Sequence, residues 1–274
     1  MAVSQVEWVS RQTEASEGPD PFGYEPAFVD RCRPLFEFFY RRYWRVQSDG
    51  LENIPDSGPA LIISNHSGGI PVDAVMLGCA VDLDHPQHRL VRFLYDRFVE
   101  AMPKMGEYYH RLGSVTATFD NARRLLEMGD LVGLFPEGVA GIGKGIWRRY
   151  RLQRFNGGFI RLSLSLRVPI IPAVVVGAEE VYPVIGRWQQ TGLKQLFNIP
   201  YVPVTPLFPW LGAIGLIPLP TKWHIRFGAP IRVYADGQLS RTPAQKTVRR
   251  LAEDVRREMQ AMLHTLLAER ESIF

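Results

Sequence analysis

The sequence contains little cysteine and little excess charge. Among its 274 residues the only cysteines are Cys32 and Cys79, which stand apart and lack the spacing of a zinc ligand set. Two isolated thiols argue against a disulfide-stapled scaffold and are typical of a reducing compartment. The formal charge of +4 gives only weak overall attraction to anionic partners, so local clusters of charge carry more information than the total.

Signals that direct a chain into or across a membrane are also missing. Residues 1–20 are polar and acidic and lack the basic-then-apolar order of a secretory signal, so we expect residues 1–27 to form a loosely ordered extension. The uncharged stretch 195–221 is interrupted by six prolines, which exclude a regular spanning helix. No internal repeat or low-complexity tract occurs. A cytoplasmic location is the expectation that follows.

Short apolar runs alternate with helical patterns through the centre of the chain. The runs cover residues 60–63, 90–94, 131–135 and 170–176, and helical spacing covers residues 120–128 and 159–166. This alternation predicts one α/β domain with a mostly parallel central sheet covered by helices. Ligands of such sheets generally bind outside the carboxyl ends of the strands, so the residues that follow each run are the first candidates for a site.

The segment Ser64–Asp73, SNHSGGIPVD, places a histidine at the end of the first apolar run. His66 would leave the sheet there, and Gly68 and Gly69 permit a sharp reversal of the chain toward Asp73. Histidine accepts and returns a proton near neutral pH, and a carboxylate can fix its tautomer. Taken alone, the segment leaves two interpretations open. His66 and Asp73 are either a general base with its partner, or a loop histidine beside an ordinary helix-start acid.

A second motif follows another apolar run. Residues 135–138 read FPEG, and the later segment 168–176 reads VPIIPAVVV. In this order the segments resemble the glycerolipid and lysophospholipid acyltransferase superfamily, over about residues 51–235. The resemblance implies an O-acyltransferase in which His66 is the general base and Asp73 its partner. It also implies that Glu137 and Gly138 lie in the acceptor site.

Two features depart from the commonest pattern of that family. Six residues separate His66 from Asp73, where the commonest pattern has four. Residues 112–119, LGSVTATF, also lack the arginine with which phosphate-handling members contact the acceptor phosphate. Residues 156–183 in turn look like the diacylglycerol acyltransferase branch. The chain is therefore interpreted as an outlying member, and its acceptor stays open between a lysophospholipid, a glycerolipid and a neutral lipid.

Two segments favour a membrane surface. Five arginines alternate with aromatic residues between Arg31 and Arg45, which predicts an amphipathic interface helix over residues 28–50. The alternative is a helix that packs its aromatic residues on the domain and leaves its arginines solvated. The insertion 195–221 would enter the interface or wall an acyl-chain channel, or else form a buried irregular connection. Together the segments predict peripheral attachment to a bilayer surface on the cytoplasmic face.

A cluster of cations lies in the loop after FPEG and surrounds Trp147. It is predicted to bind substrate through the phosphates of coenzyme A, an acidic acyl carrier protein or a lipid headgroup, with a solvated basic loop as the alternative. No nucleic-acid-binding module accompanies it, so we expect no nucleic-acid partner. The cluster comprises Lys144, Arg148, Arg149, Arg151 and Arg154.

Three other chemistries have partial signatures. Gly138, Gly143 and Lys144 match the start of a phosphate-binding loop, but Gly145 stands where a serine or threonine should reach magnesium. Ser67 is a candidate nucleophile for a lipid hydrolase, yet no G-x-S-x-G elbow occurs. The acids and histidines of residues 82–88 are interpreted as a surface turn, so neither a metal nor a cofactor is predicted.

The predicted reaction is direct acyl transfer from acyl-CoA or an acylated carrier protein. His66 would take the proton of an acceptor hydroxyl as its oxygen attacks the thioester, and amides of Gly68, Gly69 or Gly138 would stabilise the oxyanion. The alternative from another class is a non-catalytic lipid-binding or tethering protein that keeps the fold. The domain, residues 51–274, is predicted to end in a helix over residues 242–270 whose apolar stripe packs on the core.

Overall fold

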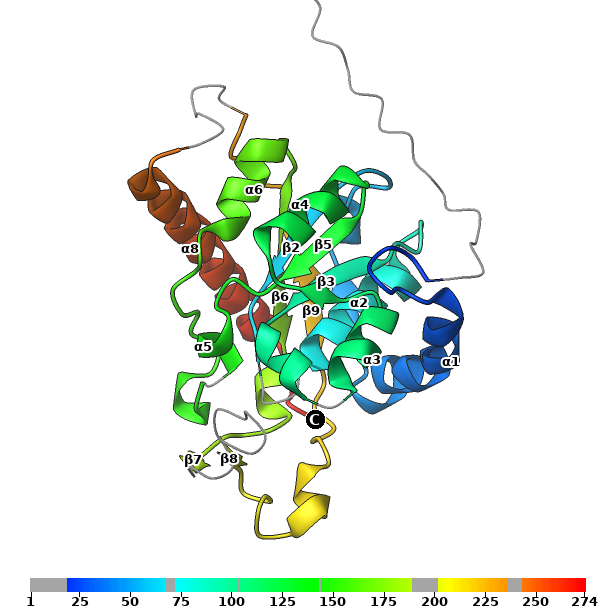
Figure 1. Ribbon diagram of the computed structural model, residues 1–274. Helices are drawn as coiled ribbons and strands as arrows, with labels where there is room; N and C mark the ends of the chain where they lie inside the picture. The colour runs from blue at the N-terminus through cyan, green and yellow to red at the C-terminus, as the bar shows by residue number, and fades with distance from the viewer. Residues whose placement is uncertain (1–18, 68–71, 103, 143, 189–201, 236–242) are drawn as a thin grey trace, which may run out of the picture.

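The computed structural model describes residues 19–67, 72–102, 104–142, 144–188, 202–235 and 243–274. A seven-stranded sheet lies at the centre of this part, in the order β1-β9-β6-β2-β5-β3-β4 (Figure 1). Strands β6, β2, β5, β3 and β4 run parallel, whereas β9 is antiparallel to β6 and β1 follows the direction of β9. The strands are β1 (Gln47–Asp49), β2 (Ala60–Ser64), β3 (Val91–Tyr95), β4 (Val115–Thr116), β5 (Leu131–Leu134), β6 (Ile170–Val176) and β9 (His224–Phe227).

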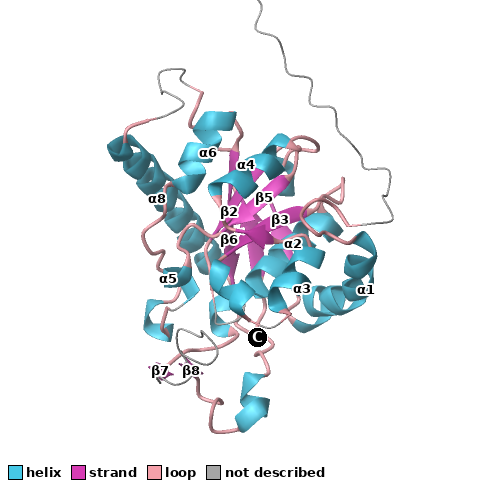
Figure 2. Ribbon diagram, viewed as in Figure 1, coloured by secondary structure: helices cyan, strands magenta, loops and turns pink. Residues whose placement is uncertain are grey.

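Helices cover both faces of the sheet (Figure 2). They are α1 (Pro26–Glu37), a π-helix (Phe38–Tyr43), α2 (Val72–Asp84), α3 (Met105–Arg111), α4 (Phe119–Glu127), α5 (Val139–Ile142), α6 (Gly158–Leu166) and α8 (Gln245–Glu269). Short 3-10 turns are Leu51–Asn53, Arg97–Ala101, Ile146–Arg148, Ala178–Glu180 and Gly212–Leu216. One apolar core joins the sheet to α4, α6 and α8, and a second joins it to the π-helix and α2. The predicted α/β class is confirmed.

The alternation of side chains along β2 shows how one strand serves both cores. Leu61 and Ile63 pack in the core beneath α4, α6 and α8, while Ala60 and Ile62 pack in the other. Successive side chains of a strand point to opposite faces, so a parallel strand buried on both sides must be apolar throughout. That requirement explains why β2 appears in the sequence as an uninterrupted apolar run.

The register of the parallel strands brings the two sequence motifs together. Ile63 of β2 lies opposite Leu134 of β5 on one side and Pro172 of β6 on the other. The residues that follow Ile63 and Leu134 therefore leave the sheet at the same edge, although the two motifs are 71 positions apart in sequence. His66 and the FPEG motif meet at the carboxyl edge of the sheet.

The predicted helices are present with small shifts in their limits. Helix α4 begins at Phe119, where the Thr118 hydroxyl caps it by accepting a hydrogen bond from the Asn121 amide at 3.1 Å. Helix α8 begins at Gln245 without a side-chain cap, and Thr242, the first residue of the helix predicted over residues 242–270, lies outside the described residues. The apolar stripe of α8 is buried in the core, as its helical spacing predicted.

The N-terminal part of the chain differs from its prediction in two ways. The helix expected over residues 28–50 ends with the π-helix at Tyr43, because the following segment pairs with β9 as β1. Its aromatic side chains Tyr40 and Trp44 are core residues, whereas Leu35 and Phe38 are exposed. The loose extension expected over residues 1–27 is also too long. Asp20 accepts hydrogen bonds from the Phe22 and Tyr24 amides and forms a salt bridge with Arg92, which fixes this part of the chain to the domain.

Part of the proline-rich insertion is described, from residue 202 onward. Its strand β8 (Val202–Val204) pairs antiparallel with β7 (Gly186–Trp188), and a 3-10 turn follows at Gly212–Leu216. The segment leaves the sheet after the carboxyl end of β6 and returns into β9, and it projects at the bottom of Figure 1. Within the described residues, no helix combines the length and apolarity needed to cross a bilayer.

Candidate active site

The imidazole of His66 is paired with the Asp73 carboxylate. His66 Nδ1 lies 2.7 Å from Asp73 Oδ2, and both residues are buried. A carboxylate only accepts, so Nδ1 carries the proton and donates it to Asp73. This tautomer leaves Nε2 unprotonated and able to accept a proton. The six residues between the two side chains do not prevent the pairing that the four-residue family pattern produces.

Further donors hold the Asp73 carboxylate in place at the start of α2. Its Oδ2 accepts the Ser67 amide at 2.8 Å and the Ser67 hydroxyl at 3.2 Å, and its Oδ1 accepts the Ala74 amide at 2.9 Å. These bonds and the favourable field at a helix start orient the carboxylate toward His66. The hydroxyl of Ser67 is thereby bonded to Asp73, which leaves little support for Ser67 as an activated nucleophile.

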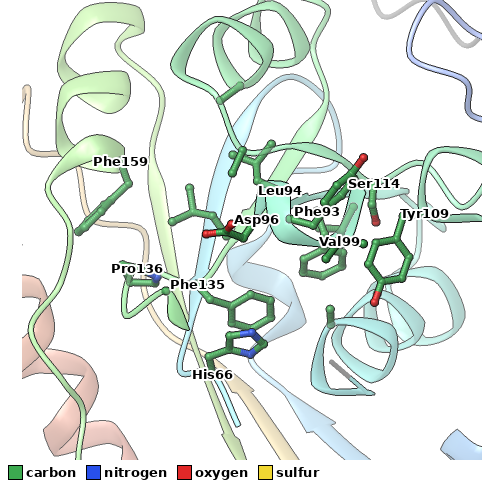
Figure 3. Close-up of a pocket in the computed structure, with 18 of the residues that line it drawn as sticks. His66, Phe93, Leu94, Asp96, Val99, Tyr109, Ser114, Phe135, Pro136 and Phe159 are labelled. Carbon is green, nitrogen blue, oxygen red and sulfur yellow. The ribbon is translucent and has the colours of Figure 1, made fainter. Parts of the chain in front are cut away.

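Phe135, the first residue of FPEG, fixes the plane of the imidazole. Its ring stacks on that of His66 with centroids 4.1 Å apart and an interplanar angle of 16°, and Phe93 stacks on the other side of Phe135. Figure 3 shows the His66 ring against Phe135, with Phe159 to one side and Tyr109 to the other. The hydrogen bond at Nδ1 and the stacked ring together limit rotation of the side chain.

Glu137 is a buried carboxylate that holds the His66 loop through the backbone. Its Oε1 accepts the His66 amide at 3.2 Å, and its Oε2 accepts the Gln153 amide at 2.6 Å. Its side chain has no exposed surface. The resemblance implies that Glu137 and Gly138 lie in the acceptor site, and both line a cavity beside His66. The contacts of Glu137 also tie three segments together.

Lys144 completes this network as an internal cation. Its ammonium lies 3.3 Å from Glu137 Oε2 and 2.8 Å from Glu179 Oε1, and it is almost fully buried. Glu179 also accepts the Tyr150 amide at 2.8 Å. Burial raises the pKa of the Glu179 carboxyl, and the Lys144 ammonium opposes that shift. The sequence interpretation assigned Lys144 to substrate phosphates, but two carboxylates already neutralise its charge.

Of the three glycines predicted as oxyanion donors, the structure describes Gly138. Gly68 and Gly69 lie outside the described residues. Gly138 has a positive φ of 56°, and its amide donates to the Phe135 carbonyl at 3.0 Å. That amide closes the FPEG turn, so it is committed to the backbone.

A cavity of about 1470 Å³ opens beside His66. Pockets that enclose a drug-sized ligand are typically about 300–1,000 Å³, so this one has room for a long chain as well as a second reactant. Its walls are mainly apolar and come from both sides of the sheet edge. Toward α1 to α3 they include Phe36, Val75, Cys79, Val99 and Met105; toward α6 and α8 they include Phe155, Phe159 and Leu162.

Comparison with known proteins identifies the family. The sequence profile of the family Acyltransferase matches residues 45–176, a range that contains His66, Asp73 and FPEG. The uncharacterized protein Rv0502 of Mycobacterium tuberculosis is 43% identical over 257 residues, which cover 93% of this chain and 71% of that protein. The chain belongs to the acyltransferase superfamily. The sequence-based prediction of the superfamily is therefore confirmed.

Two more distant members of the superfamily show how far the likeness extends. A Bos taurus protein named DGAT1/2-independent enzyme synthesizing storage lipids is 27% identical over 165 residues, covering 58% of this chain and 47% of that enzyme. The crystal structure of PlsC, the 1-acyl-sn-glycerophosphate (LPA) acyltransferase of Thermotoga maritima, matches with a TM-score of 0.51 and 16% identity. The match covers 88% of this chain and 80% of PlsC. The structural match shows a shared fold.

Only part of the basic loop after FPEG lines the cavity of this acyltransferase. Arg148, Arg149 and Arg151 are exposed and do not line the cavity that contains His66. Arg154 does line it, and so does Arg249 of α8, which sequence reasoning missed. No short motif marks Arg249, because its place depends on how α8 packs against the domain.

Asn65 and Glu179 were also missed by sequence reasoning. The Asn65 side chain donates to the Val175 carbonyl at 3.0 Å and accepts the Val175 amide at 2.8 Å. It thereby bridges the end of β2 to β6, one residue before His66. The sequence signal that could have found Asn65 is its position directly before His66.

In the described part of the chain, no group of three or more His, Cys, Asp or Glu residues could hold a metal ion.

Proposed function

We propose that the protein is a membrane-associated O-acyltransferase that moves a fatty acyl group from a thioester donor to a hydroxyl of a lipid acceptor. The observation that carries this proposal is the buried His66–Asp73 pair at the wall of a large apolar cavity. Membership of the acyltransferase superfamily supports the reaction class.

His66 Nε2 takes the proton of the acceptor hydroxyl while that oxygen attacks the thioester carbonyl. The new carbon–oxygen bond forms, the tetrahedral intermediate collapses, and the carbon–sulfur bond breaks. The imidazolium then returns its proton to the departing thiolate, which leaves as the free thiol of the carrier. Asp73 stabilises the imidazolium in between. Acid–base catalysis of this kind contributes about 100-fold to 10,000-fold in rate.

We favour an acceptor whose reacting end is neutral, such as a mono- or diacylglycerol. Leu112, Ser114, Ala117, Thr118 and Phe119 all line the cavity, and the stretch 112–119 supplies no cation to hold a phosphate there. The name of the bovine relative, an enzyme synthesizing storage lipids, points in the same direction. A lysophospholipid is the alternative within the same reaction class.

The described part of the insertion supports attachment to one face of a membrane. Trp210 and Ile214 are 74% and 66% exposed, and Leu211 and Ile217 are exposed as well. Monomeric soluble proteins rarely present such contiguous apolar groups unless they mark an interaction site. The insertion follows the carboxyl end of β6, so it stands on the edge of the sheet that carries His66. We propose that this face rests on the bilayer from which the acceptor enters.

One assay tests the proposed reaction. Purified protein on phospholipid vesicles is given radiolabelled palmitoyl-CoA or palmitoylated acyl carrier protein, with a panel of lysophospholipid, monoacylglycerol and diacylglycerol acceptors. We expect a new labelled lipid, formed most rapidly from a neutral acceptor, and none with the variant His66→Ala. Binding of these lipids without a labelled product in any combination would contradict the proposal and favour a non-catalytic lipid-binding protein.

A further inference from the structure

We propose that Arg154 and Arg249 form an anion subsite that binds the phosphate of the donor's 4′-phosphopantetheine arm at the α6–α8 end of the catalytic cavity. This inference rests on the proposed function for the thioester class of the donor. The sequence analysis assigned phosphate binding to the whole basic cluster after FPEG. The structure-based subsite keeps only Arg154 of that cluster and adds Arg249 of α8.

Arg154 is held beside the FPEG motif by its neighbours in the chain. The amide of Gln153 donates to Glu137 Oε2 at 2.6 Å, and the amide of Asn156 donates to the Pro136 carbonyl at 2.8 Å. Arg154 stands between these two anchors and lines the same cavity as His66. Its backbone is therefore fixed next to the motif that supports the catalytic histidine.

Arg249 reaches the cavity because α8 packs closely against the start of α6. A Cβ atom built at Gly157 would lie 2.4 Å from Val248 Cγ1, so only glycine permits this approach. Arg249 follows Val248 in α8 and lines the cavity together with Gln245 and Glu253. Gly157 itself lines the cavity, which puts the approach of α8 at the cavity wall.

The guanidinium groups of Arg154 and Arg249 are available to bind a ligand. Within the described residues neither has a hydrogen bond or an ion pair, whereas nearby Arg256 binds both oxygens of Glu253 at 2.9 and 2.5 Å. The Arg256 hydrogen bond is also the main cause of the lowered pKa of Glu253, to which Arg154 contributes only a weaker Coulomb effect. Glu253 is thus already paired with Arg256, as Glu137 is with Lys144, and the exposed Arg154 and Arg249 keep their donors.

Guanidinium groups bind phosphate oxygens with paired, charge-assisted hydrogen bonds. Coenzyme A and acyl carrier protein differ in most respects but present the thioester on the same arm, which ends in a phosphate. Either donor therefore brings an anion to one end of the cavity. The end near α1 to α3 has apolar walls suited to the acyl chain, and Arg33, which also lines the cavity there, is paired with Asp82. The α6–α8 end has the two arginines that have no such partner among the described residues.

The test is a binding measurement on the full chain that does not require turnover. Palmitoyl-CoA, palmitoylated acyl carrier protein and the phosphate-free palmitoyl-N-acetylcysteamine thioester are titrated by calorimetry. For the carrier that the wild type binds, we expect the double variant Arg154→Gln/Arg249→Gln to lose about tenfold or more in affinity. Its affinity for the phosphate-free thioester should be unchanged. The matched control, Arg148→Gln/Arg149→Gln, removes two exposed arginines outside the cavity and should bind every ligand as the wild type does.

Each outcome separates the inference from its alternatives. Equal losses for the phosphate-free thioester would mean that the variant disturbs the cavity wall, and a loss only in the control pair would assign the phosphate to the FPEG loop. Either result overturns the inference. Arginine-dependent binding of palmitoyl-CoA by a protein that transfers no acyl group would refute the proposed function while supporting the anion subsite. Normal transfer with an unchanged KM for the donor in the double variant would refute the subsite alone.

Discussion

Two buried carboxylates meet the same histidine, and they act on different parts of it. Asp73 binds the imidazole through Nδ1 at 2.7 Å, whereas Glu137 binds the backbone amide of His66 at 3.2 Å. Asp73 comes from the first turn of α2, and Glu137 from FPEG, which follows the neighbouring strand β5. Asp73 therefore acts on the proton chemistry of His66, and Glu137 on the position of its loop. The resemblance gave the two acids different roles, and the geometry adds that Glu137 holds the backbone of His66.

Replacing Asp73 should have the largest effect of the substitutions that separate the two acids. In Asp73→Asn the amide can no longer stabilise an imidazolium, so we expect kcat to fall by about 100-fold to 10,000-fold. The KM for palmitoyl-CoA should change little, because Asp73 is buried behind the ring. The dependence of kcat on pH should also change, because the general base loses its carboxylate partner. Steady-state kinetics across pH measures both, and an unchanged profile would place Asp73 outside the proton transfer.

Replacing Glu137 should reduce turnover less and leave the form of the pH profile intact. In Glu137→Gln one of the buried amides of His66 and Gln153 faces the NH2 donor of the new side chain instead of an acceptor oxygen, so the loop shifts. A shift of this kind can cost up to about 100-fold in kcat. The free energy of unfolding should fall by about 1–3 kcal/mol, as measured by urea denaturation. A kcat loss as large as that of Asp73→Asn together with an altered pH profile would show that Glu137 takes part in the chemistry.

Replacing Lys144 tests whether its positive charge stabilises the buried carboxylates of Glu137 and Glu179. In Lys144→Met the buried Glu137 and Glu179 lose their cation, and the pKa of Glu179, already raised by burial, rises further. A carboxyl with a folded-state pKa above its unfolded value binds more protons when folded, so stability falls as pH rises through that window. We expect a loss of about 3–5 kcal/mol in the free energy of unfolding at about pH 8 and a smaller loss at about pH 5.

The compensating variant for this prediction is Lys144→Met/Glu179→Gln. It removes one buried charge of each sign, so it should recover much of the stability at about pH 8 and weaken the dependence on pH. Urea denaturation of both variants at the two pH values gives the comparison. Equal instability of the single and double variants would show that packing, rather than charge balance, is the contribution of Lys144.

The insertion lies apart from both acids and should leave turnover on dispersed substrates unchanged. Full burial of a large apolar side chain contributes roughly 1.5–3 kcal/mol, so Trp210→Ser/Ile214→Ser should weaken binding to phospholipid vesicles by about tenfold or more. The control is Met128→Ser, at a residue 54% exposed at the end of α4, on the opposite edge of the sheet. Vesicle cosedimentation compares the three proteins. Equal binding by all of them would remove the insertion from the membrane contact.

The sequence was most informative where local pattern and tertiary structure agree. The apolar runs predicted the central strands because strands buried on both faces must be apolar throughout, and the run of β2 is such a case. His66 and FPEG each follow an apolar run and were predicted as site residues for that reason, and they meet because parallel strands end at one edge of the sheet. The hydrogen bond from the His66 amide to Glu137 was not predicted, since a side chain that accepts a backbone amide has no signature in the sequence.

The remaining differences arise from contacts that no short pattern records. Lys144 was interpreted as part of a solvated or substrate-binding loop because its neighbours in sequence are arginines, yet the fold buries it between two acids. Trp44 belonged to a pattern typical of interface helices and instead stacks on Trp223 in the core. Arg249 was part of an ordinary core helix, and its place at the cavity depends on the absence of a side chain at Gly157. Each depends on a partner far away in the sequence.

The role of His66 as general base is tested most directly by the turnover of His66→Ala on vesicles that contain the best acceptor of the wild type. If His66 is the general base, the rate of labelled lipid formation should fall by at least about 100-fold. Palmitoyl-CoA affinity and vesicle binding should remain close to those of the wild type. A variant that transfers the acyl group at a near-normal rate would contradict the central claim, whatever the other measurements show.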